Sequence, residues 1–299
     1  MKVLLTGASG FIGGHILVAL IEKLGRDSVV VLTSKAIPNI NCLLYGSFKN
    51  FNLSRSCFDD VTHVVHAGAF IPKDASQSNA IDLSFSNIQY TKELLSYGFE
   101  KVVRFINIST IDVYASTKIK VSENSDIRPV SLYGSSKLYC EEMVKTFSEQ
   151  KNASYINLRI GHVYGPGEEK YRKVIPIAIQ NVINDIPLEL WGEGEDLRSF
   201  IFIEDVVESI LNSLESSEEN IDINIVSGEA VSIRDLLYKI INVSGKDIKV
   251  DRKESNHERR DLVFDNSLLL KTLLNKETDL MHGLKLEYQY MKVRNENNI

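Results

Sequence analysis

Three polar side chains in the middle of the sequence have the types and spacing needed to move a proton at a substrate oxygen. Tyr133 and Lys137 stand four residues apart in YGSSK, and Thr110 lies upstream in STIDVY. If residues 131–150 form a helix, the phenol and the ammonium lie on one face of it. A nearby cation lowers the pKa of a tyrosine, so the phenol could exchange a proton with a substrate oxygen near neutral pH. Thr110 could donate a second hydrogen bond to that oxygen, which makes these three the expected catalytic residues.

A glycine-rich turn at the start of the chain could hold the pyrophosphate of a dinucleotide. Three glycines at positions 7, 10 and 13 follow an apolar run at 2–5 and precede a helical pattern at 12–24. The first glycine permits a tight turn, the second lets the backbone approach a pyrophosphate, and the third allows close packing of helix on strand. The start of the helix adds free N–H groups that bind phosphate. The turn predicts a dinucleotide site whose contacts are Gly7, Gly10, Phe11, Ile12 and Gly13.

The end of the second expected strand indicates which dinucleotide binds. NAD-preferring proteins with this turn place a carboxylate there for the ribose 2′-hydroxyl. Here the strand ends in Thr33, Ser34 and Lys35, and no carboxylate occupies that place. These side chains could instead donate hydrogen bonds to a 2′-phosphate, which a carboxylate would repel. NADP(H) is therefore the preferred cofactor and NAD the alternative; a solvated loop without a cofactor contact is the other interpretation of Lys35.

Strand and helix patterns alternate along the chain, which predicts a mostly parallel sheet with helices on both faces. The expected strands are 2–5, 28–33, 63–67, 103–108, 154–160 and 222–226, and the expected helices lie near 12–24, 79–97, 131–150, 172–184, 204–215, 232–243 and 266–274. The predicted fold class is α/β, a Rossmann doubly wound parallel sheet with a smaller C-terminal substrate-binding lid. Residues 1–165 are expected to form the NADP-binding domain, completed by a strand or helix from about 200–228. Residues 166–299 are expected to form mainly the lid.

Composition places the chain among ordinary globular proteins and argues against several functions. Apolar residues make up 43% and charged residues 25% of the 299 residues, which suffices for a large core. A net charge of −6 without a basic stripe argues against a nucleic-acid partner. Cys42, Cys57 and Cys140 form neither a disulfide framework nor a metal-binding pattern, so we expect a reducing compartment and no metal. No apolar run approaches about 20 residues and the first strand begins at once, so we expect a cytoplasmic protein without a membrane partner.

Several longer motifs follow one another along nearly the whole chain. They are TGASGFIG at 6–13, HVVHAGA at 63–69, Asn87 with Thr91, INISTIDVY at 106–114, YGSSK at 133–137, LRIGHVYGPG at 158–167, LRSFIFIEDVV at 197–207, INIVSGEAVSIRDL at 223–236 and ERRDLVFDNS at 258–267. In these motifs and their order the chain resembles the extended short-chain dehydrogenases/reductases of the NAD-dependent epimerase/dehydratase family. The resemblance implies a nucleotide-sugar substrate.

The resemblance also implies roles for individual residues. Tyr133 matches the catalytic tyrosine, Lys137 the lysine that holds the nicotinamide ribose, and Thr110 the catalytic serine or threonine of the family. Two residues would line the dinucleotide groove, Ala67 and Ala69. Family members commonly dimerise through the tyrosine-bearing helix and the helix before it, so a homodimer is expected.

The substrate diphosphate requires cations from the second half of the chain. Arg198 matches a family position that binds the diphosphate, and a planar guanidinium suits that task. Arg260 is expected to add a second contact in preference to Arg259, which could equally be a surface arginine paired with an acid. His162 stands where many relatives have an asparagine that contacts the diphosphate. It could donate there or be a satisfied buried histidine, and both interpretations stay open. Arg159, within a strand, is expected to be structural.

Departures from the family pattern narrow the reaction. Dehydratases of this family carry an Asp-Glu pair after the catalytic threonine, whereas this chain has Ile111 and Asp112, which disfavours dehydration. LRIGHVYGPG and FIFIEDVV look most like the CDP-abequose synthase type of 4-keto-6-deoxyhexose reductase. The expected function is therefore an NADPH-dependent reductase of a nucleotide-linked 4-keto-6-deoxyhexose in deoxysugar or surface-polysaccharide biosynthesis. The alternative is an NAD-dependent nucleotide-sugar 4-epimerase of the UDP-glucose 4-epimerase type.

Overall fold

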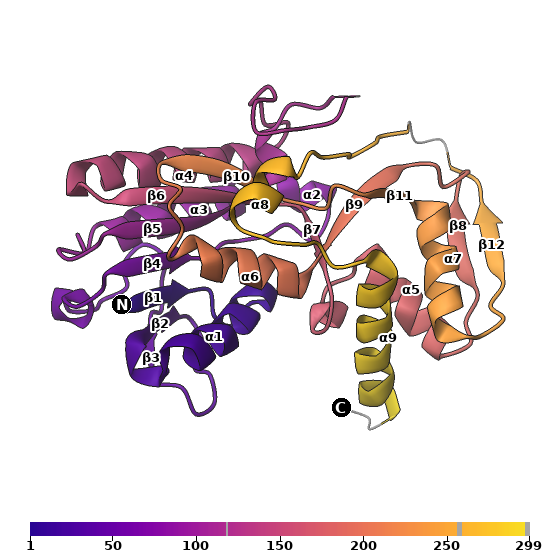
Figure 1. The fold of residues 1–299 in the computed structure, drawn as a ribbon, viewed down its shortest axis with the longest axis horizontal. Coiled ribbons are helices and arrows are strands. Elements are labelled where there is room, and N and C mark those ends of the chain that lie inside the picture. Colours follow the sequence, from indigo (N-terminus) through magenta and orange to yellow (C-terminus); the bar gives the residue numbers. More distant parts are fainter. Residues whose placement is uncertain (118, 256–258, 297–299) are drawn as a thin grey trace.

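A seven-stranded parallel sheet forms the core of the larger half of the molecule (Figure 1). The computed structural model describes residues 1–117, 119–255 and 259–296. The sheet order is β10 (Ile221–Ile225), β6 (Ser154–Ile160), β5 (Arg104–Thr110), β4 (His63–His66), β1 (Val3–Thr6), β2 (Val29–Thr33) and β3 (Cys42–Leu44). The predicted α/β, doubly wound parallel fold is confirmed. Glu258, the first residue of the ERRDLVFDNS motif, and the end of the polar tail lie outside the described residues.

Helices cover both faces of this sheet. One pair, α3 (Ile81–Leu95) and α4 (Leu132–Lys151), packs on one face, and α1 (Phe11–Leu24) and α6 (Ile203–Ser213) pack on the other (Figure 1). Alternate residues of the buried strands point to opposite faces, so Leu4 and Phe105 join one apolar cluster while Leu5 and Ile106 join the other. Near-continuous apolar runs therefore marked these strands correctly in the sequence.

The remaining segments build a smaller lobe beside the carboxyl edge of the sheet. It contains a three-stranded sheet of β7 (His162–Tyr164), β9 (Leu197–Phe202) and β11 (Ala230–Ser232), and a two-stranded sheet of β8 (Leu188–Trp191) and β12 (Val250–Lys253). Its helices are α5 (Val174–Ile183), α7 (Ile233–Ser244) and α9 (Leu280–Glu296). The short helices α2 (Ala75–Ser78) and α8 (Ser267–Thr272) lie in connections.

Sequence patterns located every strand of the central sheet except β3 and placed the helices α1 and α3–α8 within a few residues of their bounds. The patterns missed α2, the short strands of the smaller lobe and the whole of α9.

The order of the strands creates a crevice between β1 and β4. From β1 the chain proceeds outward through β2 and β3, whereas β4, β5, β6 and β10 lie on the other side. Ligands of open α/β sheets bind at such a reversal, outside the carboxyl ends of the strands. Gly7 follows β1 and Ala67 follows β4, so the expected dinucleotide residues lie at this crevice. In the described part of the chain no helix is both long and apolar enough to cross a membrane.

Candidate active site

The turn between β1 and α1 is compressed against the end of β4. Gly7 has a φ of +74°, and a Cβ at this position would come within 2.6 Å of the Ala67 carbonyl group. A Cβ at Gly13 would lie 2.0 Å from the Gly7 oxygen, and the Gly10 N–H donates to that same oxygen at 2.9 Å. Only glycine fits these contacts. Phe11 and Ile12 then begin α1, so the backbone forms a cradle that fits a pyrophosphate.

Two side chains fasten this turn to the residues that follow β4. The Thr6 hydroxyl lies 2.8 Å from His66 Nδ1 and accepts from the Gly68 N–H at 2.9 Å. Burial, with a smaller effect of the Lys137 charge, lowers the pKa of His66 to about 3, so this ring is neutral. These contacts hold the backbone around Gly68 beside Gly7, with Ala67 and Ala69 half-buried on either side.

The expected cofactor contacts at the end of β2 differ in their access to solvent. Thr33 is buried and donates to the Ser9 hydroxyl at 3.4 Å, which links β2 to the glycine turn. Ser34 and Lys35 are exposed. The Thr33 hydroxyl also accepts from the Lys35 N–H at 3.4 Å. The strand end therefore exposes the Ser34 hydroxyl and the Lys35 ammonium, while the Thr33 side chain is buried.

Thr110 and Tyr133 meet where β5 and α4 approach each other. The Ser131 hydroxyl caps α4 by accepting from the Gly134 N–H at 3.0 Å, which sets the first turn that carries Tyr133. Tyr133 and Lys137, one turn apart, are both buried, with exposed fractions of 6% and 3%. Thr110 ends β5, and its hydroxyl lies close enough to Tyr133 to act on the pKa of that phenol. The expected catalytic threonine and tyrosine therefore lie near each other, and the lysine follows on the same helical face.

The protonation of Tyr133 differs from the sequence-based expectation. Burial raises the pKa of Tyr133 above its ordinary value of 10, the Asp112 charge adds to the increase, and the Thr110 hydrogen bond only partly opposes it. The prediction that Lys137 lowers this pKa is therefore wrong for this structure. Desolvation penalises the phenolate more than nearby groups favour it. Burial also lowers the pKa of Lys137. Tyr133 is consequently a protonated phenol at neutral pH, which suits a proton donor.

Asn87 connects the loop after β4 to the helix that carries Tyr133. Its side-chain oxygen accepts from the Phe70 N–H at 2.7 Å, and its nitrogen donates to the Ser136 hydroxyl at 3.2 Å. The Phe70 ring lies edge-on to the Tyr133 ring, with centroids 6.4 Å apart. The hydrogen bonds of Asn87 therefore hold Phe70 beside the Tyr133 ring.

The expected substrate-binding residues of the smaller lobe form one cationic group. Burial and the charges of Arg198, Lys173 and Arg260 lower the pKa of His162 to about 4, which places these side chains near one another. Arg198 donates to the Leu197 carbonyl oxygen at 2.9 Å and also to the Arg260 carbonyl oxygen. Sequence reasoning missed Lys173, which pairs with Glu168 at 2.8 Å and lines a cavity of about 220 Å³ together with His162.

The surroundings of His162 and of the two arginines differ. His162 Nδ1 is buried and has no hydrogen-bond partner within the described ranges. Arg259 pairs with Asp261 at 3.0 Å and Glu195 at 3.4 Å on the surface, whereas Arg260 acts electrostatically on His162. The geometry therefore favours Arg260 over Arg259.

Asp112 is exposed and acts electrostatically on the catalytic tyrosine. Partial desolvation raises the pKa of Asp112, and the Arg260 charge opposes the increase. Because Asp112 acts on Tyr133 and Arg260 acts on Asp112, this carboxylate lies near both side chains.

Another cavity lies away from the catalytic residues. This cavity of about 740 Å³ follows the outer faces of α1 and α6 and touches Gly10 and Phe11, but neither Thr110, Tyr133 nor Lys137 lines it. In the part of the chain that the structure describes, no group of three or more His, Cys, Asp or Glu side chains could hold a metal ion.

Comparison with known proteins agrees with this geometry. Residues 3–226 match the model of the NAD dependent epimerase/dehydratase family, and the chain belongs to that family. It is 27% identical to the dTDP-4-dehydro-6-deoxyglucose reductase of Escherichia coli over 259 residues, which cover 80% of each protein. It is 28% identical to the dTDP-D-glucose 4,6-dehydratase of Dictyostelium discoideum, where the match covers 81% of this chain and 62% of the relative.

A solved structure shows the same similarity across the whole fold. The UDP-glucuronic acid 4-epimerase of Bacillus cereus, in complex with UDP-glucuronic acid and NAD, superposes with a TM-score of 0.81 at 27% sequence identity. The superposition covers 98% of this chain and 99% of the epimerase. Members with reductase, dehydratase and epimerase names are thus comparably similar, so the comparisons define the family and not the reaction.

Proposed function

We propose that this protein is an NADPH-dependent reductase of a nucleotide-linked 4-keto-6-deoxyhexose. The observation that carries the proposal is the buried Tyr133 near Thr110, one helical turn before Lys137, in a fold that also has a glycine cradle for a dinucleotide. Such a set donates a proton to a carbonyl oxygen that is being reduced. The similarity to a dTDP-4-dehydro-6-deoxyglucose reductase supports the same class of substrate.

The chain's own residues have distinct tasks in this mechanism. A bound nicotinamide dinucleotide supplies the hydride. The Tyr133 hydroxyl donates its proton to the oxygen of the ketone as that oxygen gains charge, and Thr110 donates a hydrogen bond to it. Lys137 holds the nicotinamide ribose. Arg198, Arg260 and His162 bind the diphosphate of the sugar, because guanidinium groups form paired hydrogen bonds with phosphate oxygens.

The preference for NADPH depends on the end of β2. No carboxylate follows Thr33 there, and the exposed Ser34 and Lys35 can bind a 2′-phosphate. A reductase consumes its reduced cofactor, which fits a site for NADPH. The dehydratase reaction is disfavoured because Ile111 replaces the first acid of the required pair and Asp112 is the one carboxylate left in this turn.

The alternative is a nucleotide-sugar 4-epimerase with retained NAD. The observation that favours it is the similarity to an epimerase that binds NAD, over 98% of this chain. An epimerase returns the hydride to the same sugar, so its cofactor shows no net change. The protonation state of Tyr133 also matters, because an epimerase needs the phenolate to oxidise its substrate first.

One experiment separates the two functions. Purified protein is mixed with NADPH and a panel of nucleotide 4-keto-6-deoxyhexoses, and the loss of nicotinamide absorbance is followed. We expect loss with one member, which would identify both the nucleotide and the sugar. No loss with any member, together with NAD released on denaturation, would replace the reductase by the epimerase.

We also propose that the protein is a cytoplasmic homodimer. Apolar side chains stand exposed on α3 and α4, including Ile81, Phe85 and Tyr139. Such a surface fits burial against a second copy. Sedimentation of the purified protein tests this, and a monomer at micromolar concentration would exclude the dimer.

A further inference from the structure

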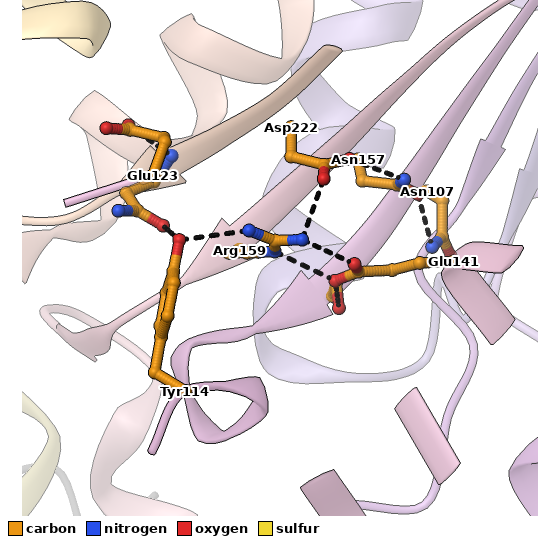
Figure 2. A network of polar contacts seen from close by, with 9 residues as sticks. Asn107, Tyr114, Glu123, Glu141, Asn157, Arg159 and Asp222 are labelled. Carbon is orange, nitrogen blue, oxygen red and sulfur yellow. Dashed lines mark hydrogen bonds and ion pairs between the residues drawn. The ribbon is translucent and has the colours of Figure 1, made fainter. Parts of the chain in front are cut away.

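A network of charged and polar side chains joins α4 to β6 and β10 (Figure 2). Glu141 follows Lys137 by one helical turn, just as Lys137 follows Tyr133. One face of α4 therefore presents a phenol, an ammonium and a carboxylate in succession, and all three are buried. A buried carboxylate is costly unless it is paired, so its partners show what it holds in place.

The Glu141 carboxylate joins three elements of the Rossmann half. It accepts from Arg159 Nε at 3.2 Å and from Arg159 Nη2 at 2.8 Å, which ties α4 to β6. It also accepts from the hydroxyl of Ser109, the residue immediately before Thr110 on β5. The same carboxylate thus fixes the helix of Tyr133 and Lys137 against the strand of Thr110.

Arg159 is held from its other side by two further contacts. Asp222 on β10 accepts from Arg159 Nη2 at 2.7 Å, and the Tyr114 hydroxyl accepts from Nη1 at 3.0 Å (Figure 2). Burial lowers the pKa of Arg159, but the hydrogen bond and the charge of Glu141 raise it above its ordinary value. The guanidinium therefore stays charged, and its anchored position fixes the orientation of Glu141.

Glu141 also acts on the charge of Lys137. Burial lowers the pKa of Lys137, while Cys140 and Glu141 oppose that decrease. Burial raises the pKa of the Cys140 thiol, and Glu141 is the member of this helix face that is ion-paired with Arg159. Without the charge of Glu141 the buried ammonium would lose its proton more readily.

We propose that Glu141, anchored by Arg159 and Ser109, is a positioning residue that keeps Lys137 charged and aligned for the cofactor ribose. The inference rests on the proposed function, because that function assigns Lys137 to the ribose. It adds a residue that touches neither substrate nor cofactor. It also explains why an acid and an arginine, 18 positions apart in sequence, are buried together beside the site.

The affinity for NADPH as a function of pH tests this proposal without turnover. Quenching of nicotinamide fluorescence gives Kd as the pH is raised from neutral, because burial lowers the pKa of Lys137 below its ordinary value. Affinity falls as Lys137 loses its proton. In Glu141→Gln the midpoint of that fall moves to lower pH by about one unit or more, which weakens binding about tenfold above the midpoint. An unchanged midpoint in a folded Glu141→Gln protein overturns the proposal.

Two matched variants separate this effect from a general loss of charge or of structure. Glu142→Gln removes the same charge from the exposed neighbour on α4 and leaves the midpoint unchanged. Asp222→Asn removes the second carboxylate from Arg159, so it lowers the melting temperature without moving the midpoint. A shift in Asp222→Asn equal to that in Glu141→Gln would assign the effect to Arg159 and overturn the role of Glu141.

Glu141→Asp decides the question if Glu141→Gln does not fold. It keeps the charge but shortens the side chain, so the midpoint stays and turnover falls about tenfold, as expected for a displaced positioning group. Wild-type turnover in this variant overturns the positioning role. If the midpoint shifts in Glu141→Gln but the wild type has no reductase activity, the proposed function is wrong and the role of Glu141 stands. If the wild type is an active reductase but the midpoint does not shift in Glu141→Gln, the proposed function stands and the role of Glu141 is wrong.

Discussion

The backbone of Gly134 lies directly against the carbonyl group of Asp112. A Cβ built at Gly134 would come within 2.3 Å of the Asp112 oxygen, and no flexible side chain could yield, because both sides of the contact are backbone. Gly134 follows Tyr133 in α4, and Asp112 follows Thr110 by two residues. Because Gly134 has no side chain, α4 can approach the Asp112 backbone closely enough to bring Tyr133 near Thr110.

Substitution of Gly134 by alanine should separate these two catalytic groups. A displacement of about 1 Å at a reacting group costs about a hundredfold in rate, so we expect kcat to fall by that order. The affinity for the dinucleotide should change much less, since the glycine turn at Gly7 is distant from this contact. Steady-state kinetics and a cofactor titration measure both quantities. Gly46→Ala, where an added Cβ meets nothing within 4 Å, is the control. Equal losses in the two variants would remove the special role of Gly134.

Substitution of Tyr133 by phenylalanine removes the proton donor and retains the packing of the ring. General acid catalysis contributes about 10² to 10⁴ in rate, so we expect turnover to fall by at least that much while NADPH still binds. Tyr139→Phe on the exposed side of the same helix is the control and should retain full activity. Normal turnover of Tyr133→Phe in the absorbance assay would show that another group protonates the ketone.

Lys35 is the cation that can distinguish NADPH from NADH. It is exposed at the end of β2, and a charge-assisted hydrogen bond to a 2′-phosphate contributes about 1.5 to 3 kcal/mol. In Lys35→Ala we therefore expect Kd for NADPH to rise about tenfold or more while Kd for NADH stays the same. Lys49→Ala, another exposed lysine, is the control for a general loss of positive charge. An equal change for both cofactors would assign Lys35 to the solvated loop.

The site residues that the sequence predicted all belong to short local motifs. Gly7, Thr110 and Tyr133 each lie at the end of a strand or at the start of a helix. Short local motifs are therefore enough to predict their positions. The Arg159–Glu141 pair could not be predicted in this way. The two charges come together only because α4 packs on β6. No local sequence pattern predicts such an ion pair. Lys173 was missed for the same reason, because its relation to His162 arises only from the fold of the smaller lobe.

Helix α9 was missed because its buried face contains an acid. The residues of α9 that point inward are Gly283, Leu284, Glu287, Tyr288 and Met291. A carboxylate and a glycine in this set break the apolar repeat from which an amphipathic helix is predicted. The short strand β8 did alternate, with Leu188 and Leu190 buried, but four residues are too few to distinguish a strand from a chance pattern.

The buried acid of α9 predicts how the stability of the protein depends on pH. Glu287 is 0% exposed, and neither carboxyl oxygen has a hydrogen-bond partner of normal geometry among the described residues. Burial and the charges of Glu168 and Glu169 raise its pKa to about 9, and the Gly165 amide opposes this only slightly. In the folded protein Glu287 is therefore a neutral acid at pH 7.

The sign of the effect follows from proton binding. Between the ordinary value of 4.5 and about 9, the folded protein holds a proton that the unfolded chain releases. The free energy of unfolding therefore falls as pH rises through this window, by about 1.4 kcal/mol per pH unit for a group of this kind. Glu287→Gln has nearly the same shape and no proton to lose, so its melting temperature should fall less between pH 6 and about pH 8.5 than that of the wild type. Glu208→Gln, on the exposed face of α6, should follow the wild type. If the melting temperatures of all three proteins fall equally between pH 6 and about pH 8.5, Glu287 is not the group that titrates.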